Sequence, residues 1–223
     1  PGRVDNKRKA IRERWWQFAE KRPGMREALR DLAECVVVRQ SSDALAPTLV
    51  PTDQVIDQTV IVIATSSRAT LAVLSSAAHQ YWVIQYGRST MGGVARYTPS
   101  NVFETFPRPA ESQWLEQIGR SLYEERRAVM LRRDLGLTSL YNRINDSGID
   151  DSGDPDLARL RALHAELETA VMDAYGWTDI QLDQGFHKYR QMERWTVCPA
   201  ARVEILDRLL EENHKRAASK GST

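Results

Sequence analysis

The segment 87–98 combines side chains that bind phosphate with side chains that read the edges of bases. Two arginines, Arg88 and Arg96, stand near its ends, and Ser89 and Thr90 follow the first of them. Arginine binds phosphate oxygens and guanine edges, while hydroxyl groups and backbone N–H groups suit phosphate. Two adjacent glycines in the same segment let a backbone approach a ligand closely. This composition favours a nucleic-acid contact, and an ordinary surface loop is the alternative interpretation.

These arginines belong to one of two basic blocks in the chain. The whole sequence has 31 Lys and Arg against 30 Asp and Glu, so its net charge identifies no partner. Residues 1–40, however, hold eleven basic and six acidic residues, and residues 60–109 hold four arginines and one glutamate. Basic surface attracts the phosphate backbone of nucleic acids. The candidate contacts are therefore Arg68, Arg88, Ser89, Thr90 and Arg96. For Arg96 the alternative is a structural role, through an ion pair with Glu104 or through bonds to backbone carbonyls.

The sequence lacks the motifs of a self-contained enzyme. It has no glycine-rich phosphate loop and no nucleophile elbow. Its four histidines are scattered, and two of them, His79 and His164, fall on apolar helix faces, which is typical of hydrogen-bonded core histidines. The acidic residues at 150–156 do not match the spacing of a calcium-binding EF-hand, so we interpret them as a solvated loop and a helix cap. We therefore predict no catalytic residue, metal or cofactor site in this chain.

Cysteine usage and hydropathy limit the cellular setting. The two cysteines, Cys35 and Cys198, stand in unrelated contexts, which excludes a disulfide scaffold. No apolar run approaches the roughly 18 residues of a membrane-spanning helix, and no secretory signal is visible at the start. We expect a cytoplasmic protein with no membrane partner.

Hydrophobic periodicity predicts an α+β protein that is rich in helix and has two parts. A small mixed α/β lobe is expected over residues 1–109, a helical C-terminal lobe over 110–217, and a disordered tail over 218–223. The predicted elements of the first lobe are helices at 6–19, 25–33 and 66–86, strands at 35–38 and 59–64, a loop at 41–57 with one edge strand, and an irregular loop at 88–100. Those of the second lobe are helices at 111–135 and 155–175, a strand pair or extended arm at 186–197, and a helix from 199. In this scheme the helix 66–86, ended by Gly87, positions the arginine loop.

The stretch from Arg96 to Pro109, with the sequence RYTPSNVFETFPRP, resembles a signature of large bacterial DNA methyltransferases. The similar proteins are the type IIG enzymes, which fuse restriction and modification, and their adenine-specific relatives in phage-defence systems. Further similar motifs occur in the same order along nearly the whole chain: RWW at 14–16, LSS at 74–76 followed by His79 and Trp82, GLT at 136–138, YNR at 141–143, AYGW at 174–177 and LDRLLEEN at 206–213.

The resemblance implies one particular part of such an enzyme. In that family a glycine-rich motif holds the methyl donor S-adenosylmethionine, and an Asn/Asp-Pro-Pro-Tyr/Phe motif holds the flipped adenine. This chain has no Pro-Pro and no Gly-x-Gly, and the nuclease motif of some members is also missing. The chain thus resembles the target-recognition region and helical tail of an adenine-N6 DNA methyltransferase, and no catalytic residue carries over.

The same resemblance implies the partners. They are double-stranded DNA and the catalytic domain of the same polypeptide, with S-adenosylmethionine as a cofactor of the parent enzyme alone. The alternative is a protein-interaction or scaffold segment, in which the C-terminal helices dock on the catalytic domain or on a defence-complex partner. In either case we expect Phe103 and Phe106, spaced i, i+3 between two prolines, to be core residues that seal the first lobe onto the helical tail without touching a base.

Overall fold

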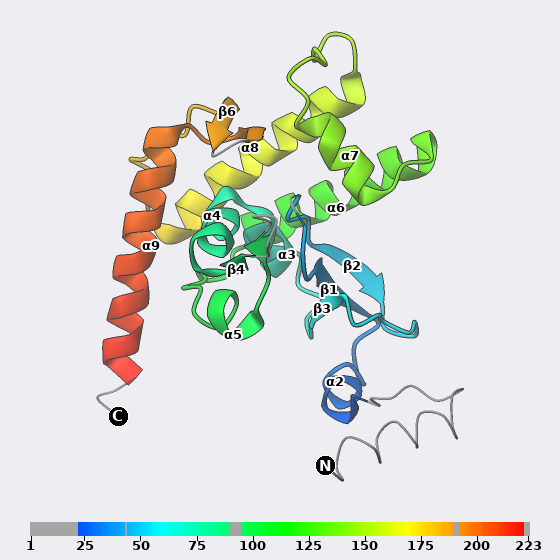
Figure 1. Cartoon of the computed structure of the whole chain (residues 1–223), viewed down its shortest axis with the longest axis vertical. Coiled ribbons are helices and arrows are strands. Elements are labelled where there is room, and N and C mark those ends of the chain that lie inside the picture. Colours follow the sequence, from blue (N-terminus) through cyan, green and yellow to red (C-terminus); the bar gives the residue numbers. More distant parts are fainter. Residues whose placement is uncertain (1–21, 43, 90–94, 190–191, 221–223) are drawn as a thin grey trace, which may run out of the picture.

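The computed structural model describes the chain from Arg22 to Lys220, except for residues 43, 90–94 and 190–191 (Figure 1). The predicted helix at 6–19 and the candidate Thr90 lie outside these residues. In chain order, the elements are α2 (Pro23–Ala28), β1 (Glu34–Arg39), β2 (Thr48–Pro51), β3 (Val60–Ile63), α3 (Arg68–Ser75), α4 (Ala77–Tyr86), β4 (Arg88–Ser89), β5 (Ala95–Arg96), α5 (Pro99–Val102), α6 (Gln113–Arg133), α7 (Leu137–Ile144), α8 (Pro155–Tyr175), β6 (Gly185–Tyr189), β7 (Met192–Thr196) and α9 (Pro199–Lys220). The predicted class, a helix-rich α+β protein, is confirmed.

Strand β1 is the centre of a three-stranded antiparallel sheet of order β2-β1-β3. Both predicted strands and the predicted edge strand are present. Val36 packs on α3 with Leu71, while Cys35 and Val37 pack on the other face with Leu29. Since successive side chains of a strand point to opposite faces, β1 is covered on both sides, and this burial explains its uninterrupted apolar run. The helix predicted at 25–33 is shorter in the structure, where α2 starts at Pro23 and ends at Ala28.

The helix predicted over 66–86 is wrong in one respect, since the structure has two helices there. Ser76 adopts an extended conformation between α3 and α4, and its hydroxyl accepts a hydrogen bond from the His79 backbone N–H at 3.4 Å. Ser67 caps α3 in the same way by accepting from the Thr70 N–H at 2.9 Å. A serine hydroxyl offers backbone donors an alternative to helical partners, so a serine within an apolar run can start a second helix. Gly87 ends α4 as predicted.

The segment 88–100, predicted as an irregular loop, has regular structure at both ends. Strands β4 and β5 form a two-stranded antiparallel ladder with Arg88 opposite Arg96 and Ser89 opposite Ala95. Pro99 then begins the short helix α5. The arginines at the two ends of the segment therefore lie side by side at the base of a hairpin.

The C-terminal lobe follows the predicted order, with one addition. Asp154 caps α8 by accepting from the Leu157 N–H, and Gly176 ends α8 with a positive φ of 74°. The strand pair β6–β7 and the last helix α9 also occur as expected. The short helix α7 was not predicted. Helix α9 continues to Lys220, into the stretch 218–223 for which we expected disorder.

One hydrophobic core joins the two predicted lobes. It draws residues from α3 and α4 in the first lobe and from α6, α8 and α9 in the second. Helix α6 passes so close to the start of α3 that a Cβ atom at Gly119 would lie 2.0 Å from the Arg68 carbonyl oxygen. Glycine is therefore required at this crossing. The hydrophobic core therefore continues across the predicted lobe boundary at 109–110, and the division into two lobes stays a prediction.

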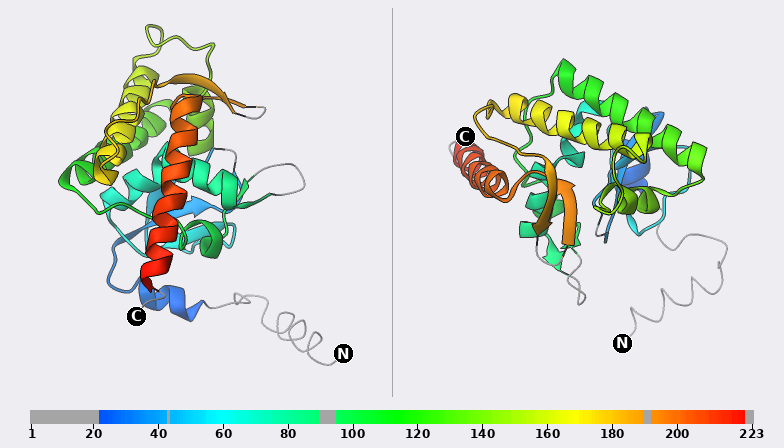
Figure 2. Two further views of the ribbon diagram at one scale, coloured as in Figure 1. Left: turned by 90° about the vertical axis from the view of Figure 1, so that its left-hand side faces the viewer. Right: turned by 90° about the horizontal axis from the view of Figure 1, so that it is seen from above.

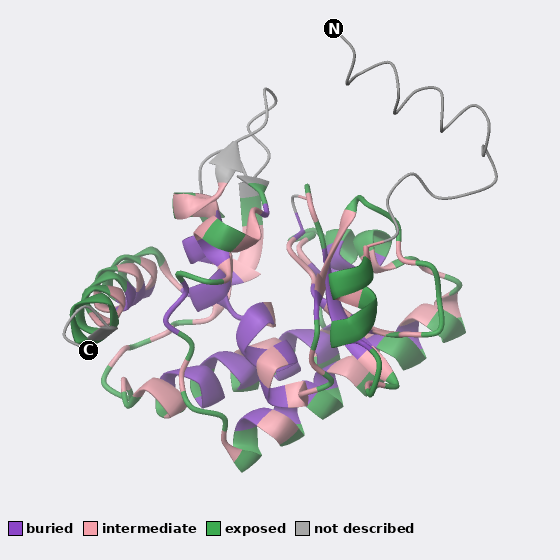
Figure 3. Cartoon of the chain, turned by 90° about the horizontal axis from the view of Figure 1, so that it is seen from below, coloured by how far each residue is buried: buried purple, intermediate pink, exposed green. Residues whose placement is uncertain are grey.

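The two hairpins lie on the same side of the molecule, and the long helices α6 and α8 lie side by side on the opposite side (Figure 2). Figure 3 shows buried residues gathered in the interior, where the helices face one another, and exposed residues along the outer faces. Among the described residues, no helix combines the length and apolarity needed to cross a membrane.

Candidate nucleic-acid interface

Arg96 presents an exposed side chain at the base of the β4–β5 hairpin. Its side chain is exposed, and within the described part of the chain no hydrogen bond or ion pair engages it. The predicted alternative, an ion pair with Glu104, does not occur. For Arg88 and Ser89 the structure describes the backbone, which pairs with β5. The structure thus brings three of the five candidate residues to one hairpin.

Close backbone packing holds this hairpin against the end of α4. A Cβ atom at Gly87 would lie 2.4 Å from the Val83 carbonyl oxygen and 3.1 Å from that of Arg96. The first contact is with a carbonyl of α4 itself, so glycine is required at the end of this helix, and the second shows that β5 passes close to the same position. On the other edge, the Tyr97 N–H donates to the Gln40 carbonyl at 2.7 Å. The backbone beside Arg96 is therefore fixed from two directions.

Tyr97, the neighbour of Arg96, is anchored in the core through His79. Its side chain is 1% exposed, and its hydroxyl lies 3.1 Å from Nε2 of His79. The Nδ1 atom of His79 lies 2.9 Å from the Leu74 carbonyl, so Nδ1 carries the proton and Nε2 accepts from Tyr97. Burial lowers the pKa of His79 to about 4 and raises the pKa of Tyr97, so both groups stay neutral. The prediction of a hydrogen-bonded core histidine is confirmed for His79.

The signature that follows β5 is packed between α4 and α9. Phe106 is buried and meets the His79 ring edge-on at 5.0 Å between centroids, as predicted for a core residue. Phe103 is half-buried, and the Arg108 guanidinium lies 4.2 Å above its ring. From α9, Asn213 donates to the Thr105 carbonyl at 2.6 Å. The C-terminal lobe therefore holds the signature in place.

Arg68 stands apart from the other candidates. Its side chain is 14% exposed, and Nη1 lies 2.5 Å from a carboxylate oxygen of Glu34. Its guanidinium also lies 4.9 Å from the centre of the Tyr123 ring. An arginine neutralised and stacked in this way serves to join β1, α3 and α6. Arg68 is therefore not part of the candidate interface.

Two buried charged residues of α8 that no sequence pattern revealed support the hairpins. The first, Glu168 of α8, accepts a hydrogen bond from the Ala77 N–H at 2.6 Å and thus caps the start of α4. Burial raises the pKa of this carboxyl to about 8. Its second oxygen has no hydrogen-bond partner among the described residues and borders a cavity of about 40 Å³ that Ser75, His164 and Gln184 also line.

The second, Arg161 of α8, lies under the β6–β7 hairpin. Its guanidinium donates to the carbonyls of Ile144 and Ile149, at 3.0 and 2.9 Å, and lies 4.7 Å from the Phe186 ring. These contacts bind the loop after α7 to the hairpin. Arg161 also forms an ion pair with Asp151 at 2.5 Å, and a buried arginine held in this way has no local sequence signature, so only the fold reveals it.

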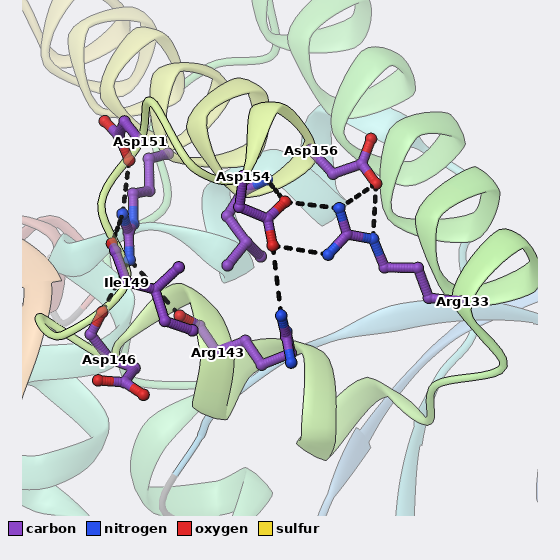
Figure 4. A network of polar contacts seen from close by, with 9 residues as sticks. Arg133, Arg143, Asp146, Ile149, Asp151, Asp154 and Asp156 are labelled. Atoms are coloured by element: carbon purple, nitrogen blue, oxygen red, sulfur yellow. Dashed lines mark hydrogen bonds and ion pairs between the residues drawn. The ribbon is translucent and has the colours of Figure 1, made fainter.

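The acidic residues after this loop form an ion-pair network instead of a metal site (Figure 4). Asp154 receives two bonds from Arg133, at 2.5 and 2.6 Å, and one from Arg143 at 3.3 Å. Asp156 also accepts from Arg133, at 2.6 Å. The bonds from Arg133 lower the pKa of Asp154 to about 2. In the described ranges, no group of three or more His, Cys, Asp or Glu could hold a metal ion.

The fold of the chain, though not its sequence, is similar to that of a known protein. No protein-family model matches the chain. No curated protein matches its sequence either. The structure is similar to that of the type IIL restriction-modification enzyme MmeI in complex with DNA, with a TM-score of 0.53 and 17% sequence identity. The likeness covers 84% of this chain and 22% of MmeI, so the chain spans less than a quarter of that enzyme. The chain therefore shares its fold with a part of a restriction-modification enzyme.

Proposed function

We propose that this chain is a DNA-binding target-recognition region, with its C-terminal support, of a site-specific adenine-N6 DNA methyltransferase. In this proposal it positions a duplex so that a catalytic domain of the same polypeptide can flip and methylate the target base. S-adenosylmethionine and the flipped adenine bind to that catalytic domain, and this chain supplies no catalytic residue.

The likeness in fold to part of MmeI is the observation that carries the proposal. It spans 84% of the chain and so includes most of both lobes. The solved MmeI structure contains DNA, and a recognition region of this kind needs an exposed cation on a firmly held element. Arg96 meets that need, because its side chain is exposed and its backbone pairs with Arg88 on one side and Ser41 on the other.

The chemistry of adenine methylation explains why such a region must exist. An enzyme that modifies a base within a duplex first turns that base out of the stack. The neighbouring bases must then be read by another surface, through the major groove, where every base pair presents a distinct pattern. A two-stranded hairpin is narrow enough to enter this groove. The β4–β5 hairpin, with Arg96 at its base, is the element that we assign to this task.

The alternative of a docking scaffold depends on exposed apolar residues of the C-terminal helices. These are Trp114 and Leu131 of α6 and Val203 and Leu210 of α9. The pair on α6 is separated by about 25 Å at 1.5 Å per residue, too far for one continuous docking surface. The pair on α9 is separated by about 10 Å along one face of the helix, so α9 is the candidate surface for this alternative.

A matched pair of variants tests the proposal on the full chain. Arg96→Ala removes the exposed guanidinium on the hairpin side, and Arg127→Ala removes an exposed guanidinium from α6 on the opposite side (Figure 2). We expect Arg96→Ala to weaken duplex binding, either uniformly with a salt slope reduced by about one, or by about 1–3 kcal/mol at one base position. Arg127→Ala should bind like the wild type. Equal affinities and salt slopes for all three proteins would contradict the proposal.

A further inference from the structure

The end of strand β1 lies directly beside Arg96, although the two are far apart in the sequence. Ser41 forms an antiparallel bridge with Arg96, and the Gln40 carbonyl accepts the Tyr97 N–H at 2.7 Å. The last residue of β1, Arg39, precedes these two positions and pairs with Val60 of β3. Its backbone is therefore held in the central sheet.

Arg39 brings a second exposed arginine to within two residues of the bridge to Arg96. It is two residues from Ser41, which is about 7 Å along an extended strand, and neighbouring strands lie about 5 Å apart. Both side chains are exposed, and across residues 22–220 outside the gaps neither guanidinium has a hydrogen bond or an ion pair. Arginine side chains can span this separation and converge on one anion between them.

Several other arginines in the described part of the chain form ion pairs within the protein. Arg68, Arg133 and Arg208 each lie against at least one carboxylate at 2.5 Å. Two like charges placed side by side repel each other and gain stability when an anion binds between them. Arg39 and Arg96 are two exposed cations that the bridge at Ser41 brings close together, so an anion bound between them would relieve this repulsion.

We propose that Arg39 and Arg96 together hold one phosphodiester of the DNA backbone. This inference rests on the proposed function and adds a contact that positions the duplex at the base of the β4–β5 hairpin. Phosphate is the expected target, because Arg39 sits at the end of a sheet strand, outside the hairpin that would enter the groove. Contacts to phosphate fix the orientation of a protein on DNA, and bases within the groove supply sequence information.

Fluorescence anisotropy with the full chain and labelled duplexes of several sequences tests this contact. Losing one phosphate contact reduces the salt slope by about 0.9, which corresponds to roughly eightfold weaker binding at about 0.1 M salt. Arg39→Ala should show this loss equally on every sequence, and Arg39→Lys should restore the slope. Because both arginines hold the same phosphate, the double variant Arg39→Ala/Arg96→Ala should lose less than the product of the single losses. Arg127→Ala is the control for the loss of one positive charge, and unchanged melting temperatures exclude a folding defect.

The outcomes separate this inference from the proposed function. If the wild type binds duplex DNA and Arg96→Ala weakens it, but Arg39→Ala matches Arg127→Ala, the paired contact is wrong and the recognition role stands. A loss confined to one base position would assign Arg39 to base reading and would equally overturn the phosphate contact. If the wild-type chain binds no duplex, both proposals fail.

Discussion

Replacing Glu168 by Gln should change how the stability of this protein depends on pH. The buried carboxyl caps α4 through the Ala77 N–H, and burial raises its pKa from 4.5 to about 8. Below pH 4.5 the carboxyl is protonated in both the folded and the unfolded chain, so folding carries no ionisation penalty. As pH rises from 4.5 to 8, the unfolded chain releases this proton while the folded chain keeps it. The free energy of unfolding therefore falls across this window and levels off above pH 8.

The size of the effect follows from the pKa shift. At about 1.4 kcal/mol per pKa unit, a rise from 4.5 to about 8 corresponds to a loss on the order of 5 kcal/mol by pH 8 and above. Glutamine keeps the carbonyl oxygen that accepts from Ala77 but cannot ionise. We therefore expect Glu168→Gln to match the wild type near pH 4.5 and to exceed its stability by several kcal/mol at pH 8.

Urea unfolding of both proteins over this pH range measures the difference directly. Glu166→Gln, a change at an exposed glutamate of the same helix, is the matched control and should leave the pH profile of the wild type unaltered. Parallel pH profiles for the wild type and Glu168→Gln would refute the argument, since they would mean that the carboxyl ionises normally in the folded chain. The result concerns function as well, because α4 carries the β4–β5 hairpin at its C-terminal end.

Three further predictions concern packing, ion pairing and the methyl donor. Phe106→Ala should lower the free energy of unfolding by about 3–5 kcal/mol, as is typical for a buried phenylalanine, and Phe103→Ala should lower it less because Phe103 is only half-buried. Thermal denaturation measures both variants, and equal melting temperatures would disprove the packing described for the signature. Arg133→Ala should destabilise the protein by about 1.5–3 kcal/mol because it removes charge-assisted bonds to Asp154, whereas Arg132→Ala, which removes one bond to Asp156, should destabilise it less. Urea unfolding measures both variants, and the reverse order would contradict the network. The chain alone should not bind S-adenosylmethionine in calorimetry, because its sequence has no Gly-x-Gly motif, and micromolar binding would assign it a donor site.

Local sequence signals predicted the elements that depend on local chemistry. Strands β1 and β3 follow from β-branched runs, because such residues suit a buried pleated surface. The start of α8 follows from Asp154 and the proline after it, and its end from Gly176, whose positive φ favours glycine. The break at Ser76 was missed because the hydroxyl that caps α4 lies within an apolar, helix-like pattern.

Contacts between distant segments could not be predicted in this way. Arg161 and Glu168 are charged residues that a sequence pattern places on a solvated face. In the structure Arg161 donates to the Ile149 carbonyl in the loop after α7, and Glu168 accepts from the Ala77 N–H, 91 residues away. The proximity of Arg39 and Arg96 likewise depends on the bridge at Ser41. The composition of 87–98 predicts a nucleic-acid contact, which stays a prediction, and no sequence signal revealed that Arg68 is paired with Glu34.

Binding of the wild-type chain to a labelled DNA duplex over a series of salt concentrations tests the central claim most directly. The account predicts that log affinity falls linearly with log salt concentration. Each phosphate contact contributes about −0.9 to the slope, so the total slope should be about −0.9 or more negative. The dissociation constant for a mixed-sequence duplex should lie near about 10⁻⁴ to 10⁻⁶ M at physiological salt. Absence of binding at low salt, or affinity that does not change with salt, would contradict a DNA-binding role for this chain.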